Sequence, residues 1–314
     1  MIKIDLITGF LGSGKTTFIK KYAHYLIENG YKIGIIENDF GAVNVDMMLL
    51  QDVIGNQCDL EMISGGCDQE THRRRFKTKL ISMGMLGYDR ILIEPSGIYD
   101  VDEFFDVLYE EPLNNWYEIG NVIAIVDAKL ENNLSKGSQY LLASQLANAG
   151  CILLSQSQEA SQYDIQQTID HVHQAFKQVH CRRQLQDEII TKSWDDLNEQ
   201  DFENILHCGY TSSNYVKLSF QHNQAYTSLY FMNVHTSEDK LYTAVQQIMN
   251  DPSCGKVFRI KGFMQLENQQ WIELNATHHH ISIQPITLGQ EIMIVIGEGL
   301  VENRIKDYWP KRGE

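Results

Sequence analysis

The segment that constrains this chain most lies directly after its first apolar run. Residues 9–17 read GFLGSGKTT and match the pattern G-x-x-x-x-G-K-[ST] in full. In such a loop the glycines let backbone N–H groups turn inward around phosphate oxygens, provided that a strand precedes the loop and a helix follows it. The aliphatic run Ile2–Thr8 and the amphipathic stretch after Gly14 supply that context. The sequence therefore predicts a strand, a phosphate-binding loop and a helix at the N-terminus.

The side chains of this loop have separate expected roles. Lys15 is expected to reach the terminal phosphates of a nucleotide, and the hydroxyl of Thr16 to bind Mg²⁺. The residues of the loop that are expected to hold the nucleotide are Gly12, Ser13, Gly14, Lys15, Thr16 and Thr17. A nucleoside triphosphate with Mg²⁺ is accordingly the first ligand that the sequence predicts.

Carboxylates end two further strand candidates. Glu94 closes one, with an ordinary strand end as the alternative, and Glu37 closes the other, with Asp39 two residues later. Pro-Ser-Gly follows Glu94, so Gly97 can offer its N–H to the γ-phosphate. Because loops at the carboxyl ends of parallel strands share one edge of a sheet, these residues can face the phosphates. The candidate Mg²⁺ ligands are therefore Thr16, Glu94 and Asp39, and the candidate catalytic residues are Lys15, Glu37, Asp39 and Glu94.

The first two thirds of the chain alternate short β-branched runs with longer amphipathic segments. That alternation predicts crossover units and a mostly parallel sheet, which is an α/β fold. The expected strands are Ile2–Thr8, Lys32–Glu37, Leu60–Ser64, Arg90–Glu94, Val122–Asp127, Cys151–Ser155 and Glu188–Lys192. We assign residues 1–210 to this nucleotide-binding domain.

The remainder of the chain has a different pattern. Ser, Asn, Gln and His loosen the sequence over residues 211–225, which we predict to be a linker. Residues 226–314 hold strand candidates in succession, which predicts a smaller α+β domain with an antiparallel sheet. The expected strands are Ser228–Val234, Lys256–Leu266, Gln270–Asn275, His279–Gln284 and Glu291–Ile296, with helices near Glu238–Asn250 and Leu300–Tyr308.

Composition excludes several other classes of protein. The chain has 314 residues, with 26 Lys and Arg against 41 Asp and Glu, and a formal charge of −15, whereas a generic nucleic-acid surface needs clustered positive charge. No apolar run approaches the roughly 20 residues of a membrane-spanning helix, and the N-terminus lacks a signal-peptide cleavage site. Six scattered cysteines fit reduced thiols better than a disulfide framework. We therefore expect a cytoplasmic protein that binds neither nucleic acid nor membranes.

In chain order, the motifs resemble those of the CobW-like P-loop GTPases, relatives of the HypB and UreG metallochaperones. The phosphate loop is followed by ENDFG at residues 37–41, by EPSG at 94–97 and by VDA at 126–128, and RIKGF at 259–263 is similar to an element of the family's C-terminal domain. The resemblance covers essentially the whole chain. It implies a P-loop NTPase fold, Mg²⁺-dependent hydrolysis, and delivery of a metal to, or activation of, a client metalloprotein or cofactor-dependent enzyme.

The chain departs from the family's pattern at its metal motif. Members carry C-x-C-C after the third strand, a thiolate cluster suited to Zn²⁺, whereas residues 66–70 here read GCDQE. For the histidines nearby, a solvated position on a helix is the alternative to metal binding. The candidates for a harder and weaker site for Zn²⁺ or another transition metal are Cys67, Glu37 and Glu70, assisted by His72, His171 or His173.

A second departure concerns the base. Members usually place N/S/T-K-x-D after a buried strand, where the Asp carboxylate accepts hydrogen bonds from guanine. Residues 155–158 here read SQSQ, so Gln156 stands in the position of the Lys and Gln158 in that of the Asp. A neutral amide offers one acceptor and one donor in place of the charged bidentate contact that excludes adenine. We therefore predict that these glutamines bind the base with weakened guanine selectivity, so that ATP is an alternative to GTP.

Three hypotheses about activity remain open at this point. The first is a slow NTPase whose loops switch between two arrangements to release a metal or remodel a client. The second is a non-hydrolysing module in which nucleotide stabilises a partner-binding conformation, and the third is a small-molecule kinase. The triplet Arg73–Arg75 is either a solvated helix face, a docking patch for an acidic client or a phosphate contact from a mobile loop. The sequence leaves the client and the oligomeric state open.

Overall fold

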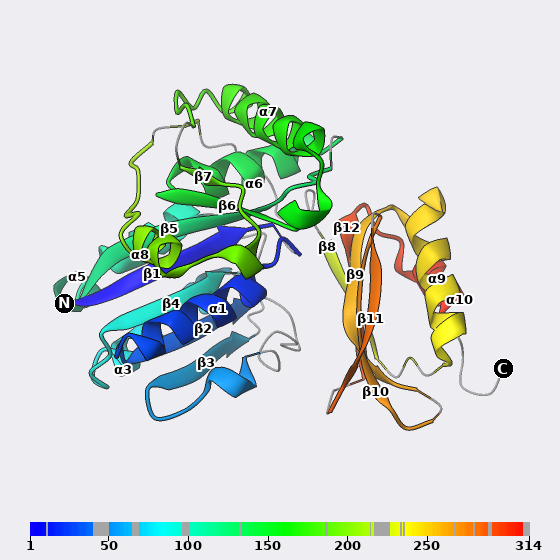
Figure 1. The fold of residues 1–314 in the computed structure, drawn as a ribbon, viewed down its shortest axis with the longest axis horizontal. Coiled ribbons are helices and arrows are strands. Elements are labelled where there is room, and N and C mark those ends of the chain that lie inside the picture. Colours follow the sequence, from blue (N-terminus) through cyan, green and yellow to red (C-terminus); the bar gives the residue numbers. More distant parts are fainter. Residues whose placement is uncertain are drawn as a thin grey trace. The chain divides into compact units, whose positions relative to one another are not determined.

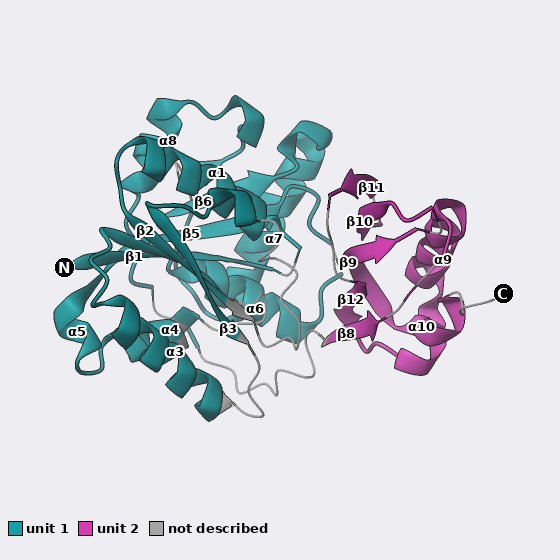
Figure 2. Cartoon of the chain, turned by 90° about the horizontal axis from the view of Figure 1, so that it is seen from below, with its two compact units in different colours: residues 1–219 teal, residues 220–314 magenta. Residues whose placement is uncertain are grey.

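The computed structural model describes most of the chain. The described residues are 1–10, 12–39, 50–64, 69–95, 101–131, 133–185, 188–213, 215–216, 227–232, 234, 236–266, 268–278, 280–287 and 291–309, with the backbone alone at 38, 39, 64, 69, 102, 103 and 227. Contacts within the chain divide it into two compact units, residues 1–219 and 220–314 (Figure 2). The linker over residues 211–225 stays a prediction.

A seven-stranded sheet forms the centre of the first unit. Its order is β3-β2-β4-β1-β5-β6-β7, and every neighbouring pair runs parallel (Figure 1). The strands are β1 (Ile2–Gly9), β2 (Ile33–Asp39), β3 (Cys58–Ser64), β4 (Arg90–Pro95), β5 (Tyr117–Asp127), β6 (Cys151–Ser155) and β7 (Ile189–Ile190). This arrangement confirms the predicted α/β fold.

Helices cover both faces of this sheet. Figure 2 shows α1 and α8 on one face and α3, α4, α5 and α6 on the other. Because both faces are covered, β4 and β6 are buried at every residue, which is why they read as continuous apolar runs. The helices are α1 (Lys15–Glu28), α3 (Gln69–Met83), α4 (Val101–Leu108), α5 (Leu113–Trp116), α6 (Lys136–Ala147), α7 (Gln162–Gln178) and α8 (Glu199–Leu206), with 3-10 turns η1 (Gln51–Val53), η2 (Ser157–Glu159) and η3 (Trp194–Asp196).

Strand β5 is longer than predicted. It begins at Tyr117, whereas the sequence predicted a start at Val122. The prediction missed the first part of the strand because polar residues that resemble a loop precede its apolar half. Among them, Asn121 is only 1% exposed. Its Nδ2 donates to the carbonyl oxygen of Leu206, and its Oδ1 accepts from the N–H of Gly209. Because Asn121 is polar but buried through these hydrogen bonds, the sequence pattern did not indicate that this part of the chain belongs to the strand.

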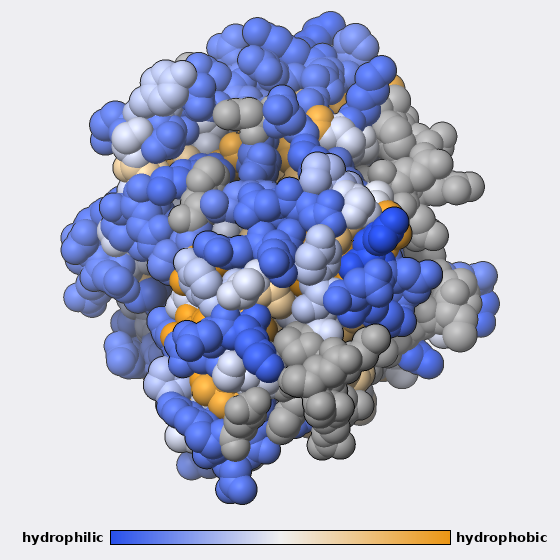
Figure 3. Space-filling view, turned by 90° about the vertical axis from the view of Figure 1, so that its right-hand side faces the viewer, coloured by the Kyte–Doolittle hydropathy of each residue, from blue (hydrophilic) through white to orange (hydrophobic). Residues whose placement is uncertain are grey.

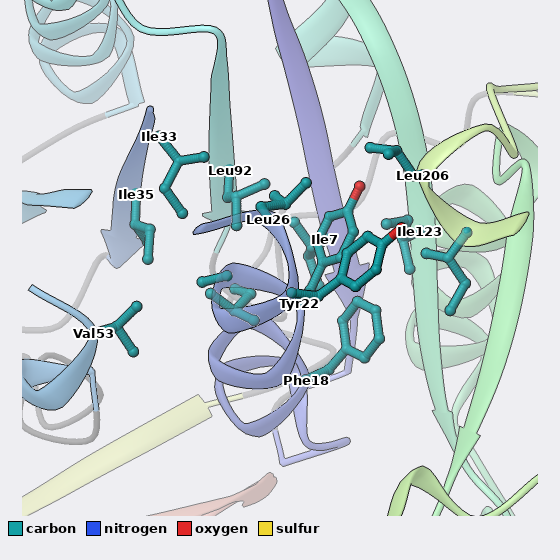
Figure 4. Close-up of a cluster of buried hydrophobic side chains, with 14 of the residues drawn as sticks. Ile7, Phe18, Tyr22, Leu26, Ile33, Ile35, Val53, Leu92, Ile123 and Leu206 are labelled. Atoms are coloured by element: carbon teal, nitrogen blue, oxygen red, sulfur yellow. The ribbon is translucent and has the colours of Figure 1, made fainter. Parts of the chain in front are cut away.

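Helix α1 is held against the sheet by the hydrophobic side chains that it buries (Figure 4). Phe18, Tyr22 and Leu26 recur every four residues, so they lie on one face of the helix, and all three are fully buried. Burying a side chain of this size contributes about 1.5–3 kcal/mol to stability. The same cluster contains residues of six strands, among them Ile7, Ile33, Ile35, Leu92 and Ile123.

A charge pair is buried beside this core. Asp5 of β1 and Arg90 of β4 form an ion pair and are 0% and 3% exposed. Asp5 also accepts from the Tyr22 hydroxyl at 3.0 Å and from the Asn121 N–H at 2.9 Å. Burial and the neighbouring carboxylate raise the pKa of Tyr22 well above its usual value, so its hydroxyl keeps the proton that it donates. The pair fixes β1 against β4, and Tyr22 ties α1 to both.

In the second unit, the described residues form a five-stranded antiparallel sheet and two α-helices. Its order is β11-β10-β9-β12-β8. Leu241, Val245 and Ile248 of α9 are buried at helical spacing, and α9 packs against β9. This unit confirms the predicted α+β architecture. The elements are β8 (Thr227–Met232), α9 (Glu238–Asn250), η5 (Pro252–Cys254), β9 (Lys256–Gln265), β10 (Trp271–Thr277), β11 (Ile281–Ile286), β12 (Ile292–Glu298) and α10 (Glu302–Tyr308).

The surface agrees with the acidic, polar composition. Figure 3 shows a face on which hydrophilic side chains predominate and hydrophobic ones occur in small, separate spots. Within the described residues, no helix combines the length and apolarity that crossing a bilayer requires.

Replacing Asp5 by Asn should destabilise the first unit strongly. The amide keeps the size of the side chain but leaves the guanidinium of Arg90 buried without a countercharge, which costs about 3–5 kcal/mol of the free energy of unfolding. Urea unfolding followed by circular dichroism measures the loss. The control is Arg74→Ala, which breaks an exposed ion pair with Glu70 and should cost less than about 1 kcal/mol. Equal losses in the two variants would contradict the role assigned to Asp5.

Candidate functional site

The chain turns sharply between β1 and α1. Gly14 has a φ of 100°, and a Cβ on Gly9 would lie 2.2 Å from the carbonyl oxygen of Ile125, so both positions require glycine. Helix α1 then begins without a side-chain cap and without an acidic residue in its first turn. The free N–H groups at its start, together with the helix dipole, favour an anion. This geometry is what a phosphate-binding loop requires.

Three buried side chains converge beside this helix start. Lys15, Thr16 and Glu94 are 5%, 7% and 6% exposed. The Nζ of Lys15 donates to the Phe10 carbonyl oxygen at 3.2 Å and lies 3.8 Å from Glu94 Oε1. The Thr16 hydroxyl donates to the same Glu94 oxygen at 3.1 Å. The structure therefore brings together the lysine, hydroxyl and carboxylate that the sequence proposed for phosphate and Mg²⁺.

A second carboxylate lies level with Glu94. Glu37 of β2 is paired with Glu94 in the β2–β4 register and is 2% exposed. Asp39 ends the same strand opposite Ser64, but its side chain is outside the described residues, as are Gly97 and Cys67. Two acidic side chains thus come from neighbouring strand ends, as the parallel topology predicts.

The donors in this cluster suit Mg²⁺. This ion prefers hard oxygen ligands and is usually held by one or two protein oxygens together with substrate phosphates. The hydroxyl of Thr16 and the carboxylate of Glu94 already lie within 3.1 Å of each other at the helix start. Thr17, by contrast, has an exposed side chain, so its contribution to the loop is its backbone N–H.

The predicted base-binding residues follow β6 and lie beside the loop. An ideal Cβ on Gly14 would be 3.6 Å from the Cβ of Ser155, which places the end of β6 against the phosphate loop. Gln156 has a φ of 53° and directly precedes η2. Its side chain is half-buried, whereas that of Gln158 is exposed. Both amides thus belong to the turn after β6, at the edge of the sheet that also carries the phosphate loop.

The histidines proposed as assistants to a metal site are not all solvated. His72 and His171 are 2% and 6% exposed, which corrects the solvated alternative for these two. Burial lowers the pKa of both imidazoles, and Arg75 lowers that of His72 further. Glu70 is exposed and paired with Arg74. No group of three or more His, Cys, Asp or Glu side chains is arranged for a metal within the described residues.

The arginine triplet on α3 is part of the ion-paired surface. Arg73 and Lys77 both pair with Glu110, at 2.5 and 2.6 Å, and these contacts lower the pKa of the Glu110 carboxyl. Arg74 pairs with Glu70 one turn away. These contacts fit the solvated helix face better than a docking patch.

Most of the described thiols are inert. Cys58, Cys151, Cys181 and Cys254 are buried. Burial is the main cause that raises the pKa of Cys58 to about 12 and that of Cys254 to about 11, so their thiolates are scarce at neutral pH.

One aromatic residue beside the loop was missed. Trp194 of η3 follows the last strand of the sheet, and its ring contacts both Gly14 and Phe18. The available signal was its position just after the Glu188–Lys192 strand candidate, at the sheet edge where the other site residues lie.

Comparisons with known proteins agree with this geometry. A family model described as CobW/HypB/UreG, nucleotide-binding domain, matches residues 3–185. The zinc chaperone YjiA of Escherichia coli (strain K12) is 30% identical over 190 residues, which cover 58% of this chain and 55% of YjiA. The zinc chaperone YeiR of the same organism is 32% identical over 158 residues, which cover 50% and 47%. The chain therefore spans about half the length of the curated relatives it matches.

A solved structure was also compared. Zn(II)-bound YjiA GTPase from E. coli aligns over 99% of both chains, with 21% identity and a TM-score of 0.35. The fold assignment rests on the strand order and not on this alignment. The family model covers more than half of the chain, including the phosphate loop, both carboxylate-ending strands and the turn after β6. The chain therefore belongs to the CobW/HypB/UreG family, through its nucleotide-binding domain.

Proposed function

We propose that this protein is a slow, Mg²⁺-dependent NTPase that uses GTP or ATP to deliver a metal to, or to activate, a client metalloprotein or cofactor-dependent enzyme. The observation that carries the proposal is the convergence of Lys15, Thr16 and Glu94 at an uncapped helix start. Family membership supports the nucleotide part. The zinc chaperones among the relatives support the metal part.

Each buried side chain has one task in the proposed reaction. Lys15 exchanges the Phe10 carbonyl and Glu94 for oxygens of the terminal phosphates, where it neutralises charge that develops as the γ-phosphoryl group leaves. Thr16 and Glu94 would hold Mg²⁺, which when bound would supply further neutralisation of the phosphate charge. Glu37, level with Glu94, orients the attacking water and accepts its proton. Asp39 as a further Mg²⁺ ligand and Gly97 as a γ-phosphate donor belong to the same proposal.

In this proposal, uncharged side-chain amides bind the purine base of the nucleotide. Gln156 and Gln158 stand where the family places a lysine and an aspartate, and the exposed amide of Gln158 can turn to match either purine. Without the carboxylate, the penalty that guanine-specific sites impose on adenine is absent. Both GTP and ATP are therefore proposed as substrates.

The transition metal is cargo in this proposal. Cys67, Glu37 and Glu70 stay its predicted ligands, with Zn²⁺ as the leading candidate because two relatives are named zinc chaperones. A mixed thiolate and carboxylate site binds Zn²⁺ less tightly than a thiolate cluster does. Weak binding suits a protein that must give its metal away.

Lys15→Ala should lower the Mg²⁺-dependent turnover of GTP and ATP by about 100-fold or more, because the main positive charge on the terminal phosphates is lost. Phosphate release under single-turnover conditions measures this effect. Lys20→Ala is the control, since Lys20 lies on the same helix and pairs at the surface with Asp52. Turnover that Lys15→Ala leaves unchanged would exclude the NTPase. Tight binding without turnover, even with a client, would favour the non-hydrolysing module, and phosphate transfer to a small molecule would favour the kinase.

The double variant Gln156→Lys/Gln158→Asp should raise the ratio of GTP to ATP affinity by about tenfold or more, because it restores a charged acceptor for guanine. Calorimetry with non-hydrolysable analogues measures both affinities. Glu159→Gln, an exposed change in the same turn, should leave the ratio unaltered. A wild-type protein that already prefers GTP strongly would contradict the predicted loss of selectivity.

Protein purified without chelators or added nucleotide should carry a bound purine nucleotide and Mg²⁺. Native mass spectrometry and elemental analysis of untreated protein identify both, together with any transition metal. A Lys15→Ala sample prepared in parallel should lose the nucleotide. Wild-type protein that carries neither nucleotide nor metal, and takes up neither when they are supplied, would contradict the proposal.

A further inference from the structure

Residues 194–203, named here the α1 strap, run along one stripe of helix α1. Positions 14, 18, 21 and 25 are spaced by four, three and four residues, so they share a face of the helix. The strap contacts this stripe from end to end. The contacts are Trp194 on Phe18 with ring centroids 5.7 Å apart, Asp195 with Lys21 at 2.8 Å, Phe202 stacked on Tyr25 at 5.1 Å, and Glu203 accepting from the Tyr25 hydroxyl at 2.8 Å.

The first residue of the strap reaches the phosphate loop itself. An ideal Cβ on Gly14 would lie 3.1 Å from Cη2 and 3.3 Å from Cζ3 of the Trp194 indole. The indole therefore packs directly on the last glycine of the loop, and the Cβ of Ser155 in β6 lies 3.6 Å from the same point. Both the strap and the end of β6 thus contact Gly14.

Trp194, the end of β6 and the turn that follows it also carry buried polar atoms. The Nε1 of Trp194 and the hydroxyls of Ser155 and Ser157 are buried, and none has a hydrogen-bond partner among the described residues. Buried donors and acceptors without partners are unfavourable and rare. Two of these three residues, Trp194 and Ser155, lie against Gly14.

We propose that Trp194 is a positioning residue of the phosphate loop, bracing Gly14 and the first turn of α1 in the arrangement that binds nucleotide. Glycine carries no side chain that could fix its own backbone, and its N–H must point at the phosphates. A rigid ring packed behind Gly14 supplies that restraint before the ligand arrives. This inference rests on the proposed nucleotide binding.

Trp194→Ala should raise the KM for Mg²⁺-nucleotide about tenfold while kcat changes less than about twofold, because a positioning contact acts on the loop and not on the reacting atoms. Trp194→Phe should restore most of the affinity, since its ring can still pack on Gly14. The control is Asp196→Ala, an exposed residue of the same turn. The nucleotide-induced rise in melting temperature, compared between variants, separates loop positioning from a general loss of stability.

Intrinsic fluorescence gives a second readout that requires no destabilised variant. An indole whose N–H is buried and unpaired should change its emission when its surroundings change, so nucleotide should alter the emission of wild-type protein and leave that of Trp194→Phe unaltered. The emission of Trp116, Trp271 and Trp309 provides a constant background. Trp194→Leu replaces Trp194→Ala if the latter does not fold.

The outcomes separate the two proposals. Calorimetry that detects no nucleotide binding to the wild-type protein would overturn the proposed function and this inference with it. Wild-type binding matched by equal affinity in Trp194→Ala or Trp194→Leu, with no emission difference between wild type and Trp194→Phe, would overturn the positioning role alone.

Discussion

The pairing of β4 between β1 and β2 is the constraint on which the candidate site depends. The phosphate loop leaves β1 at Gly9, and the β2–β4 register sets Glu37 opposite Glu94 at the same edge of the sheet. A slip of β4 by one residue would turn Glu94 to the opposite face and away from Glu37. The buried pair of Asp5 and Arg90 opposes such a slip between β1 and β4, because only the observed register satisfies its charge. A contact deep in the sheet therefore controls the geometry of the chemistry at its edge.

The protein must hold a polyanion while carrying a formal charge of −15. The site achieves this locally, through an uncapped helix start, backbone N–H groups and one buried lysine, with Mg²⁺ as the further cation that the proposal requires. Glu94 plays two opposed parts in this balance. In the proposed reaction it would hold Mg²⁺, and in the structure its carboxylate lies 3.8 Å from the Nζ of Lys15, which phosphates would have to draw away. The surrounding acidic surface would repel free nucleotide, so the short-range contacts of the loop must supply the affinity.

The fold was predictable because its signals are local. Strand β6 of the first unit is a continuous buried run, and Trp271–Thr277 of the second unit alternates buried and half-buried positions. The features that could not be predicted from the sequence depend on contacts with residues that are distant along the chain. Asn121 is buried by hydrogen bonds to residues 206 and 209, His72 lies on a helix whose sequence is predominantly polar, and Trp194 acquires its place only when η3 folds against α1. The phosphate loop could be identified from its sequence motif, whereas no motif identifies Trp194, whose ring packs against the loop.

The buried, protonated thiols have a consequence for the handling of a soft metal. A carrier that offered thiolates throughout its interior would become a kinetic sink, because each site would retain ions that the client should receive. Burial raises the pKa of the Cys58 and Cys254 thiols, and within the described residues neither belongs to a group of three or more side chains arranged for a metal. A soft ion that entered the described core would therefore find isolated thiols and no cluster that could retain it.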